Sequence, residues 1–315
     1  MPTVSVIVCT HNPRRDYLRR TLDALHHQSL HTSRWELILV DNCSDPPLAP
    51  EVDLSWHQRG RHVREPRLGL TPARVRAIDE AVGDLLIFVD DDNVLDPDYL
   101  TLAVEIAGQY PFLGAFGAGC LTPEFETPPE ANVRPFLPRL ALRASARATW
   151  SNNPNDGEAC PYGAGLCVTR RTAKAFGRLL SELKTADVLG RRGARLTSNE
   201  DDLFTWAATA EGLGVGVFPG LKITHLINAR RVSRTFILRL LKDSRFSECL
   251  LYYLLTGSQP RRFRPRMMAA VLLAAFRGSF ALRCRVAALQ GELMASRFIA
   301  VHQLQPRAIK SPHRA

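Results

Sequence analysis

The sequence has no hydrophobic run long enough to cross a lipid bilayer. Its longest apolar stretch beyond the first strand-like runs covers residues 267–276, where Arg277 interrupts it after ten residues. A spanning helix needs about 20 such residues. A secretory leader is not expected either, because the chain passes from Met1 and Pro2 directly into the apolar residues 4–8 without a basic region. We therefore expect a cytoplasmic protein without a transmembrane segment.

Clustered cysteines are also missing. The seven cysteines are odd in number and scattered along the chain, and they form no CxxC pair and no Cys/His cluster. Structural zinc sites and disulfide-stabilised small domains depend on such spacings. We therefore expect reduced thiols, with neither a zinc site nor a disulfide framework.

Acidic residues are scarce in the last quarter of the chain. Residues 230–315 hold 17 of the 41 Lys and Arg but only three acids, a net charge of +14, whereas residues 1–229 carry −4. The chain therefore divides into a slightly acidic body, residues 1–229, and a basic extension, residues 230–315, which is expected to be helical. Because single-sided positive charge favours an anionic partner, the extension is expected at the inner face of a membrane or packed on the body with a solvated arginine face.

Three apolar runs dominate the first 90 residues. They cover residues 4–8, 35–40 and 85–89, and segments with helical spacing lie between them at 17–25 and 70–82. Thr71 and Pro72 suggest the start of the second helix. Unbroken apolar strands that alternate with helices are typical of a mostly parallel sheet covered on both faces. The sequence therefore predicts an α/β fold.

The later chain is less regular. We expect loops over residues 122–160, with one helix near 135–147, and a strand at 162–168. A helix is expected at 200–211, short strands at 215–218 and 222–226, and helices from residue 232 onward, including one over 267–299.

Polar side chains follow all three early strands. These clusters are Cys9–Asn12, Asp41–Asp45 and Asp90–Asp92. Ligands of parallel α/β sheets bind beyond the carboxyl ends of the strands. The three clusters are therefore expected to meet in one crevice, which forms a candidate site.

The run Asp90-Asp91-Asp92 is the centre of this candidate site. Carboxylates crowded at a strand end repel one another, and a divalent cation relieves that repulsion. Oxygen ligands suit Mg²⁺ or Mn²⁺, which are commonly shared with substrate phosphates. The alternative is a solvated acidic turn that caps the next helix.

Asp41 and Arg74 have two interpretations each. The Asp41 carboxylate could accept a hydrogen bond from a nucleobase, or it could be an ordinary turn residue. Arg74 could pair with a diphosphate, with Arg76 as a competitor, or it could be a solvated helix residue.

Five segments resemble, in this order, the motifs of family-2 inverting glycosyltransferases with the GT-A fold. They are VSVIVCTHN, LILVDNCSD, EPRLGLTPARVRAI, LLIFVDDDN and SNEDDLF. The resemblance spans residues 3–228. It implies transfer of a sugar from a nucleotide-diphospho-sugar, with UDP-sugars favoured, to a saccharide or lipid-linked hydroxyl in polysaccharide or glycolipid synthesis.

The resemblance also implies roles for individual residues. Cys9, Thr10 and His11 would lie against the donor base, and Asp41 would read it. Arg74 matches the arginine of the family's ARN segment, although Val75 departs from that pattern. Asp90 and Asp91 would bind the nucleotide. Asp92 is expected to ligate Mn²⁺ or Mg²⁺, together with Asp90. His225 lies where a histidine of related enzymes reaches the metal or the diphosphate, and a structural role at the strand end is the alternative.

Glu200 and Asp201 resemble the family's Glu-Asp pair, in which the aspartate is the catalytic base. Inversion needs an acceptor hydroxyl that loses its proton as it attacks the anomeric carbon. Asp202 is the alternative base, and helix capping is the alternative role for all three. The small residues Gly163 and Gly165 resemble the acceptor-side strand.

Two other functions are considered. A nucleic-acid-binding protein could use the basic extension, but no nucleic-acid signature accompanies the charge, so no nucleic acid is expected. A nucleotidyltransferase on a related fold would carry a glycine-rich phosphate loop after the first strand, where this chain has CTHNPRR.

Overall fold

The computed structural model describes residues 3–183, 190–193, 195–260 and 278–306. By internal contacts the chain divides into two compact units. The first comprises Met1–Glu124, Ala141–Glu182 and Glu200–Leu226, and the second Phe125–Leu140, Leu183–Asn199 and Ile227–Ala315. The predicted extension lies in the second unit, which also takes in two earlier stretches. The functional division at residue 229 stays a prediction.

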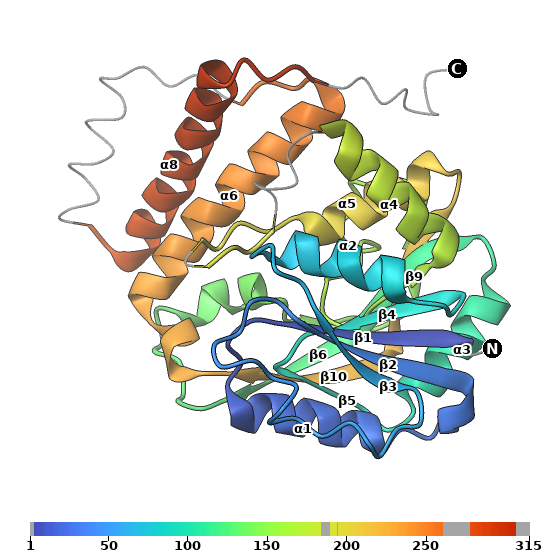
Figure 1. The fold of residues 1–315 in the computed structure, drawn as a ribbon. Helices are drawn as coiled ribbons and strands as arrows, with labels where there is room; N and C mark the ends of the chain where they lie inside the picture. Colours follow the sequence, from blue (N-terminus) through green and yellow to red (C-terminus); the bar gives the residue numbers. More distant parts are fainter. Residues whose placement is uncertain (1–2, 184–189, 194, 261–277, 307–315) are drawn as a thin grey trace. The chain divides into compact units, whose positions relative to one another are not determined.

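One half of the sheet is parallel, as the sequence predicts. Its strands are β1 (Val4–Thr10), β2 (Trp35–Asp41), β3 (Gly60–Arg64) and β4 (Leu85–Val89), in the order β3-β2-β1-β4 (Figure 1). The register pairs Thr10 with Asp41 at the carboxyl ends of β1 and β2. β1, β2 and β4 are almost wholly buried, which explains why their sequences are continuous apolar runs.

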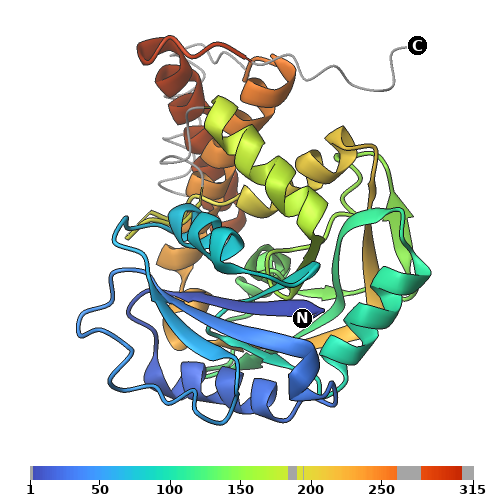
Figure 2. The same ribbon diagram turned by 45° about the vertical axis from the view of Figure 1, so that its right-hand side comes forward.

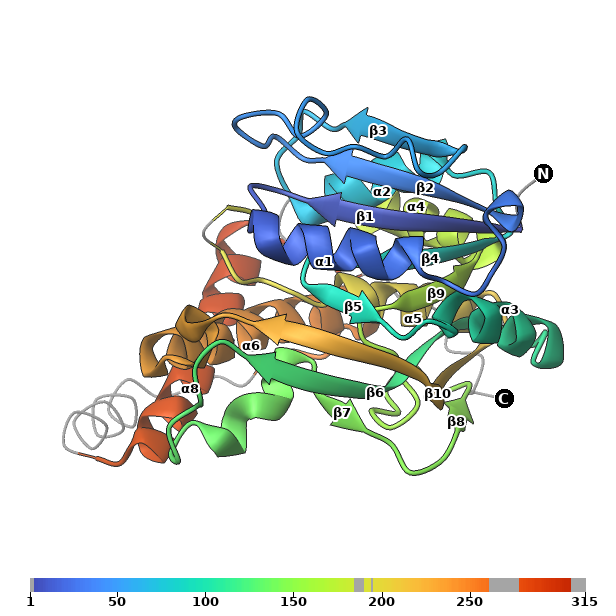
Figure 3. The same ribbon diagram turned by 90° about the horizontal axis from the view of Figure 1, so that it is seen from below.

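The other half of the sheet contains antiparallel strand pairs. Strand β9 (Leu166–Thr169) is antiparallel to β4, and β6 (Leu113–Phe125) is antiparallel to β9. The order continues through β10 (Gly214–Ile227) to β5 (Asn93–Leu95), with β7 (Arg143–Ala144) on β6 and β8 (Thr149–Ser151) on β10. This half returns residues far apart in the sequence to the end of β4 (Figure 3).

Helices cover both faces of the sheet in the first unit. α1 (Arg15–His26) and α3 (Tyr99–Gln109) pack on one face, where Leu18, Leu22, Tyr99 and Leu100 share a core with alternate residues of β1, β2 and β4. α2 (Leu70–Glu80), α4 (Arg170–Leu183) and α5 (Glu200–Ala210) lie on the other face. Figure 2 shows the sheet separating α1, in blue, from α2, in cyan, and α4, in light green.

Several predicted elements differ in extent. α2 begins at Leu70, with Gly69 rather than Thr71 at the N-cap. The expected helix near 135–147 is a short 3-10 helix, Arg134–Leu140, because Pro135 and Pro138 cannot donate helical hydrogen bonds. β9 begins only at Leu166, and the two strands expected at 215–226 are one continuous strand, β10. The strand β6 and the helix α4 are additional to the elements expected from the sequence.

The second unit contains two helices that pack side by side and run in the same direction, since Arg234 lies over Phe280 at their starts and the Tyr253 hydroxyl donates to the Leu304 carbonyl at their ends. α6 (Arg234–Thr256) is capped by Ser233 and ends at Gly257 in the left-handed conformation; α8 (Phe280–Val301) is capped by Ser279. Short 3-10 helices cover Ala229–Val232 here and Thr32–Arg34 in the first unit. The helix expected over 267–299 is observed from residue 280, and residues 261–277 lie outside the described part of the chain.

No helix among the described residues combines the length and apolar composition that a membrane span requires.

Gly291 sets the approach of α8 to α6. A Cβ atom there would lie 2.1 Å from the carbonyl oxygen of Lys242 and 3.0 Å from the amide nitrogen of Phe246. Both atoms belong to the α6 backbone, so a side chain can be accommodated only by moving the helices apart.

We therefore expect Gly291→Ala to destabilise the protein by about 1–3 kcal/mol, because overpacking outweighs the helix propensity of alanine. Gly177→Ala is the matched control: this glycine of α4 has nothing within 4 Å of its Cβ position, and alanine should stabilise by up to about 1 kcal/mol. Urea unfolding measures both. Equal free energies of unfolding for the two variants would contradict the close helix contact.

Candidate active site

The ends of β1, β2 and β4 meet as the strand pattern predicts. The Thr10 hydroxyl donates a hydrogen bond to the Asp91 carboxylate, and the backbone amide of Asn42 donates to the backbone carbonyl of Thr10 at 2.8 Å. The His11 ring lies 2.7 Å, Nδ1 to oxygen, from the Asn42 carbonyl. The three polar clusters of the sequence therefore form one site at this edge of the sheet.

Two left-handed residues lock the first two loops together. Asn12 and Cys43 have φ angles of 47° and 59°. The Asn12 amide donates to the Ser44 hydroxyl at 3.0 Å, and the Asn12 side chain accepts from the Asp45 amide at 2.8 Å. Asparagine tolerates this backbone region better than most residues. The loops after β1 and β2 thus hold each other in place.

Asp41 is buried, with 4% of its surface exposed. Its carboxylate accepts hydrogen bonds from the amides of Ser44 at 2.9 Å and Leu48 at 3.0 Å, and from the Arg64 guanidinium. Burial alone would raise the pKa of the Asp41 carboxyl, but these hydrogen bonds outweigh it and lower the pKa. Asp41 therefore organises its own turn, and its contact with a nucleobase stays a prediction.

Asn42 is a site residue that the sequence analysis did not single out. Its amide group donates to the carbonyls of Glu65 at 3.1 Å and Arg67 at 2.7 Å, and accepts from the Gly69 amide at 2.7 Å. It thereby ties the end of β2 to the loop that leads into α2. The signal in the sequence was its position next to Asp41.

Cys9 lies at the carboxyl end of β1, beside the acidic cluster. Burial of the Cys9 thiol raises its pKa to about 12, an effect that Arg74 opposes and that Asp90 and Asp91 reinforce. The thiol is therefore neutral at physiological pH. Cys9 therefore offers packing and a weak hydrogen-bond donor to a ligand.

The three aspartates after β4 have three different neighbours. Asp90 is 40% exposed at its side chain and lies 3.8 Å, Oδ1 to Nη2, from Arg74. Asp91 accepts from Thr10, as described. The Asp92 Oδ1 accepts from the Asn93 side chain at 3.1 Å, and its Oδ2 lies 3.4 Å from the His225 Nε2. The run therefore spreads its charge over several partners.

His225 reaches Asp92 through the antiparallel half of the sheet. β10 pairs with β5 so that His225 is opposite Asn93, and the Leu226 amide donates to the Asp92 carbonyl at 2.8 Å. His225 is 3% exposed. Its imidazole and the Asp92 carboxylate are close enough to ligate the same cation. Among the described residues, however, no three His, Cys, Asp or Glu side chains are grouped as a metal site.

Arg74 is almost completely buried, with 2% exposed. Its Nη1 lies 3.3 Å from Glu200 Oε1, its Nη2 reaches Asp90, and its guanidinium carbon is 5.3 Å from the centre of the Phe88 ring. Burial would lower the pKa of the Arg74 guanidinium, but the charges of Glu200, Asp90 and Asp201 outweigh it and raise the pKa. Arg74 is thus a permanent cation among carboxylates.

The Glu200–Asp201–Asp202 run occupies the first turn of α5, where acidic side chains complement the helix dipole. Asp201 Oδ2 accepts from the Gly163 amide at 2.9 Å, and its Oδ1 accepts from the Asp202 amide at 3.1 Å. Asp201 is partly exposed, whereas Glu200 is buried. Of these two residues, Asp201 is therefore the one open to a substrate.

Gly163 and Gly165 stand where side chains would collide with the site. A Cβ at residue 163 would lie 2.9 Å from Arg74 Nη2. Gly165 has a φ of 70°, and a Cβ there would be 2.4 Å from the hydroxyl of Tyr99, which donates to the Gly165 carbonyl at 2.7 Å. Close packing accounts for both glycines, and an acceptor-side role stays a prediction.

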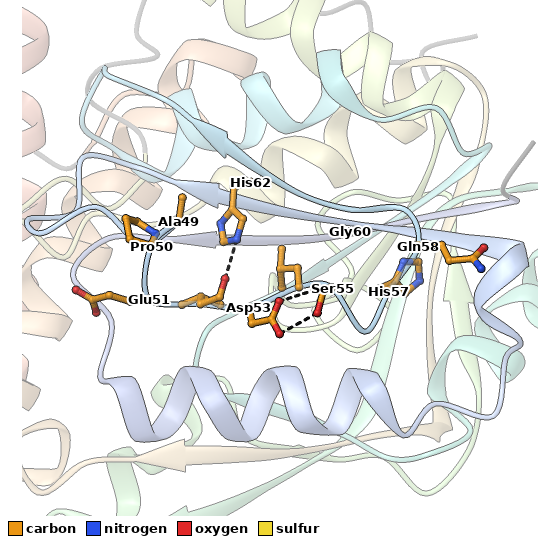
Figure 4. Close-up of a pocket in the computed structure, with 11 residues that line it drawn as sticks. Ala49, Pro50, Glu51, Asp53, Ser55, His57, Gln58, Gly60 and His62 are labelled. Carbon is orange, nitrogen blue, oxygen red and sulfur yellow. Dashed lines mark hydrogen bonds between the residues drawn. The ribbon is translucent and has the colours of Figure 1, made fainter.

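A separate cavity of about 630 Å³ is lined by residues of the β2–β3 connection and β3, from Ala49 to His62 (Figure 4). His62 Nε2 lies 2.9 Å from the Val52 carbonyl, and Asp53 accepts from the Ser55 amide and hydroxyl. None of the candidate site residues lines this cavity.

Comparisons with known proteins agree with this geometry. Residues 5–149 match the family model of glycosyl transferase family 2. The chain is 29% identical over 110 residues to the putative glycosyltransferase EpsH of Bacillus subtilis. This alignment covers 34% of this chain and 31% of EpsH. It is 30% identical over 112 residues to the succinoglycan biosynthesis protein ExoM of Rhizobium meliloti, covering 33% and 34%. The chain thus spans about a third of these curated relatives, and 12% of the uncharacterised protein y4gI of Sinorhizobium fredii.

Solved structures share the fold at low sequence identity. The mannosyltransferase PcManGT from Pyrobaculum calidifontis superposes with a TM-score of 0.53 at 17% identity, over 96% of this chain and 88% of that one. Staphylococcus aureus TarS superposes with a TM-score of 0.50 at 13% identity, over 94% of this chain and 55% of the TarS chain. Residues 5–149 therefore match glycosyl transferase family 2, and the chain shares the GT-A fold of these structures.

Proposed function

We propose that this chain is a metal-dependent inverting glycosyltransferase that moves a sugar from a nucleotide-diphospho-sugar to a hydroxyl acceptor in glycan synthesis. The observation that carries the proposal is that the buried Arg74 guanidinium lies between Asp90, from the donor-side run, and Glu200, next to the candidate base. An acidic donor side and a partly exposed carboxylate within one cluster are what such a displacement requires.

Asp92 and His225 would hold the divalent cation, with Asp90 as a further oxygen ligand. Since their donor atoms are 3.4 Å apart, the two side chains fit neighbouring ligand positions of one ion, and substrate oxygens would complete the set. When bound, the ion would neutralise the charge on the departing diphosphate. An imidazole ligand favours Mn²⁺ over Mg²⁺, which prefers oxygen; the related PcManGT was solved with GDP-Man and Mn²⁺.

The loop after β1 and the Asp41–Asn42 turn would receive the nucleotide. Cys9, Thr10 and His11 line the end of β1, and His11 is exposed enough to stack on a base. The motif resemblance favours UDP, whereas PcManGT was solved with GDP-Man. Both nucleotides are therefore the probes for binding experiments.

Asp201 would act as the base. Its carboxylate takes the proton of the acceptor hydroxyl as that oxygen bonds to the anomeric carbon. On the opposite side the bond between the anomeric carbon and the diphosphate oxygen breaks, and the nucleoside diphosphate leaves with the electron pair. Attack opposite the leaving group inverts the anomeric configuration. The match to a glycosyltransferase family disfavours both the nucleic-acid-binding and the nucleotidyltransferase alternatives.

We expect Asp201→Asn to leave nucleotide binding unchanged and to lower kcat at least about 100-fold, the usual contribution of a positioned general base. Release of UDP or GDP from a panel of nucleotide sugars measures turnover, and calorimetry measures binding. Asp202→Asn, one residue along the same turn, is the control and should retain most activity. The reverse result would make Asp202 the base.

We expect Asp92→Asn and His225→Gln each to weaken Mn²⁺-dependent binding of UDP or GDP by about 10-fold or more, because each removes one metal ligand. Asp23→Asn, an exposed change on α1, is the control. Calorimetric titration with and without Mn²⁺ separates metal-dependent from metal-independent binding. Unchanged Mn²⁺-dependent affinity in both variants would refute this metal site.

An anionic membrane surface is the partner we propose for the second unit. That unit holds 23 of the 41 Lys and Arg and six of the 31 acids. On α8, Arg283, Met294, Arg297 and Val301 recur at intervals of 11, three and four residues, so they share one face of the helix. Met294 and Val301 are 44% and 76% exposed. Exposed apolar and basic side chains on one helix face suit the headgroup layer of an anionic bilayer.

We expect the wild-type protein to sediment with phosphatidylglycerol vesicles but not with phosphatidylcholine vesicles, and less so as salt rises. The pair Arg283→Glu and Arg297→Glu should weaken this binding at least about 10-fold, given about 1 kcal/mol for each basic residue at such a surface. The pair Arg19→Glu and Arg147→Glu, in the first unit, changes net charge equally and is the control. Equal losses would show that net charge alone, rather than the α8 face, drives binding.

A further inference from the structure

The Arg74 guanidinium occupies the interior of the site rather than its surface. It is 2% exposed, and it lies between Asp90 and Glu200 and near the Phe88 ring. A donor phosphate could reach it only after the surrounding side chains moved. We propose that Arg74 is a positioning residue, which fixes the first turn of α5 and so holds Asp201 in place, rather than a contact of the donor diphosphate. This inference rests on the proposed function of Asp201.

Glu200 is the link between Arg74 and the base. Its Oε1 lies 3.3 Å from Arg74 Nη1, and its own side chain is buried. Glu200 precedes Asp201 in the chain and shares the first turn of α5 with it. A shift of the Glu200 side chain therefore moves the backbone that carries Asp201. Removal of one partner of a buried pair is costly because it leaves the other charge uncompensated.

Gly163 contacts the base carboxylate and also lies close to the Arg74 guanidinium. Its amide donates to Asp201 Oδ2 at 2.9 Å. A Cβ on the same residue would lie 2.9 Å from Arg74 Nη2 and 3.6 Å from the Asp201 Cβ. The absence of a side chain thus lets the guanidinium and the base carboxylate pack on one peptide. Arg74, Glu200, Asp201 and Gly163 form a closed ring of contacts.

The ring has a kinetic consequence. A displacement of a catalytic group by about 1 Å can cost about 100-fold in rate. The loops that would bind the nucleotide are held by other bonds, those of Asn12, Asp41 and Asn42. Loss of Arg74 should therefore slow the chemical step and leave nucleotide affinity nearly unchanged.

The first test separates kcat from binding in Arg74→Met and Arg74→Lys. UDP and GDP with Mn²⁺ are the binding probes, and release of UDP or GDP from UDP-sugars and GDP-mannose reports turnover. We expect Arg74→Met to lower kcat about 100-fold with Kd within about threefold of wild type. Arg74→Lys should recover part of kcat, because one ammonium group can pair with Glu200 but lacks the planar fork. A Kd raised 10-fold or more, with kcat at saturating donor unchanged, would instead make Arg74 a donor contact.

The second test leaves the charge in place. Gly163→Ala pushes a methyl group against Arg74 Nη2, so kcat should fall at least about 10-fold at unchanged Kd, since the base moves while the nucleotide loops do not. Gly157→Ala is the control, because nothing lies within 4 Å of a Cβ there. Wild-type kcat in Gly163→Ala would overturn the proposal. This variant also keeps the proposal testable if Arg74→Met does not fold.

A third measurement does not depend on turnover. Arg74→Met, Glu200→Gln and the double variant form a cycle in urea unfolding. We expect the double variant to have a higher unfolding midpoint than Arg74→Met alone, because the uncompensated Glu200 charge is gone. Additive changes in midpoint would overturn the positioning role. If wild-type protein released no nucleotide from any donor, the proposed function would fail, whereas this cycle would still decide whether Arg74 and Glu200 act together.

Discussion

The buried Arg74 cation is the interaction on which the rest of the site depends. It comes from α2, and the carboxylates around it come from the end of β4 and the start of α5. Without a cation, Asp90, Glu200 and Asp201 would bring like charges together in a region where burial makes charge costly. One guanidinium thus allows acidic residues from segments more than a hundred positions apart to share a small volume.

The sheet provides the frame for this arrangement through its change of strand direction. The parallel half places the ends of β1, β2 and β4 at one edge, where Thr10, Asn42 and Asp91 connect the loops. The antiparallel half returns β10 to β5, so that His225 lies beside Asp92. The same half carries Gly163, just before β9, to the base helix. A purely parallel sheet would have left these later residues without a route to the strand ends.

Much of this could be predicted from the sequence, for local reasons. The strands β1, β2 and β4 are buried on both faces, so each is an unbroken apolar run in the sequence. The polar residues that follow parallel strands meet at one edge of the sheet. Strand β6 was not predicted, because its sequence turns polar towards its end, and the predicted strand at 162–168 is observed only from Leu166 as β9. Asn42 was overlooked because its three hydrogen bonds go to backbone groups of residues 65–69, which no local pattern reveals.

Arg74 shows the difference between what the sequence determines and what only the tertiary structure decides. The sequence by itself determined the α/β architecture, the acidic strand end and the acidic start of α5, because each follows from the periodicity and chemistry of neighbouring residues. Only the tertiary structure decided that the Asp41 carboxylate accepts hydrogen bonds from the turn that follows it, and that Arg74 faces Glu200 rather than solvent. The physical reason is that the burial and the partners of a side chain depend on segments distant in the chain. The type of the residue and its neighbours in the sequence do not reveal which segments these are.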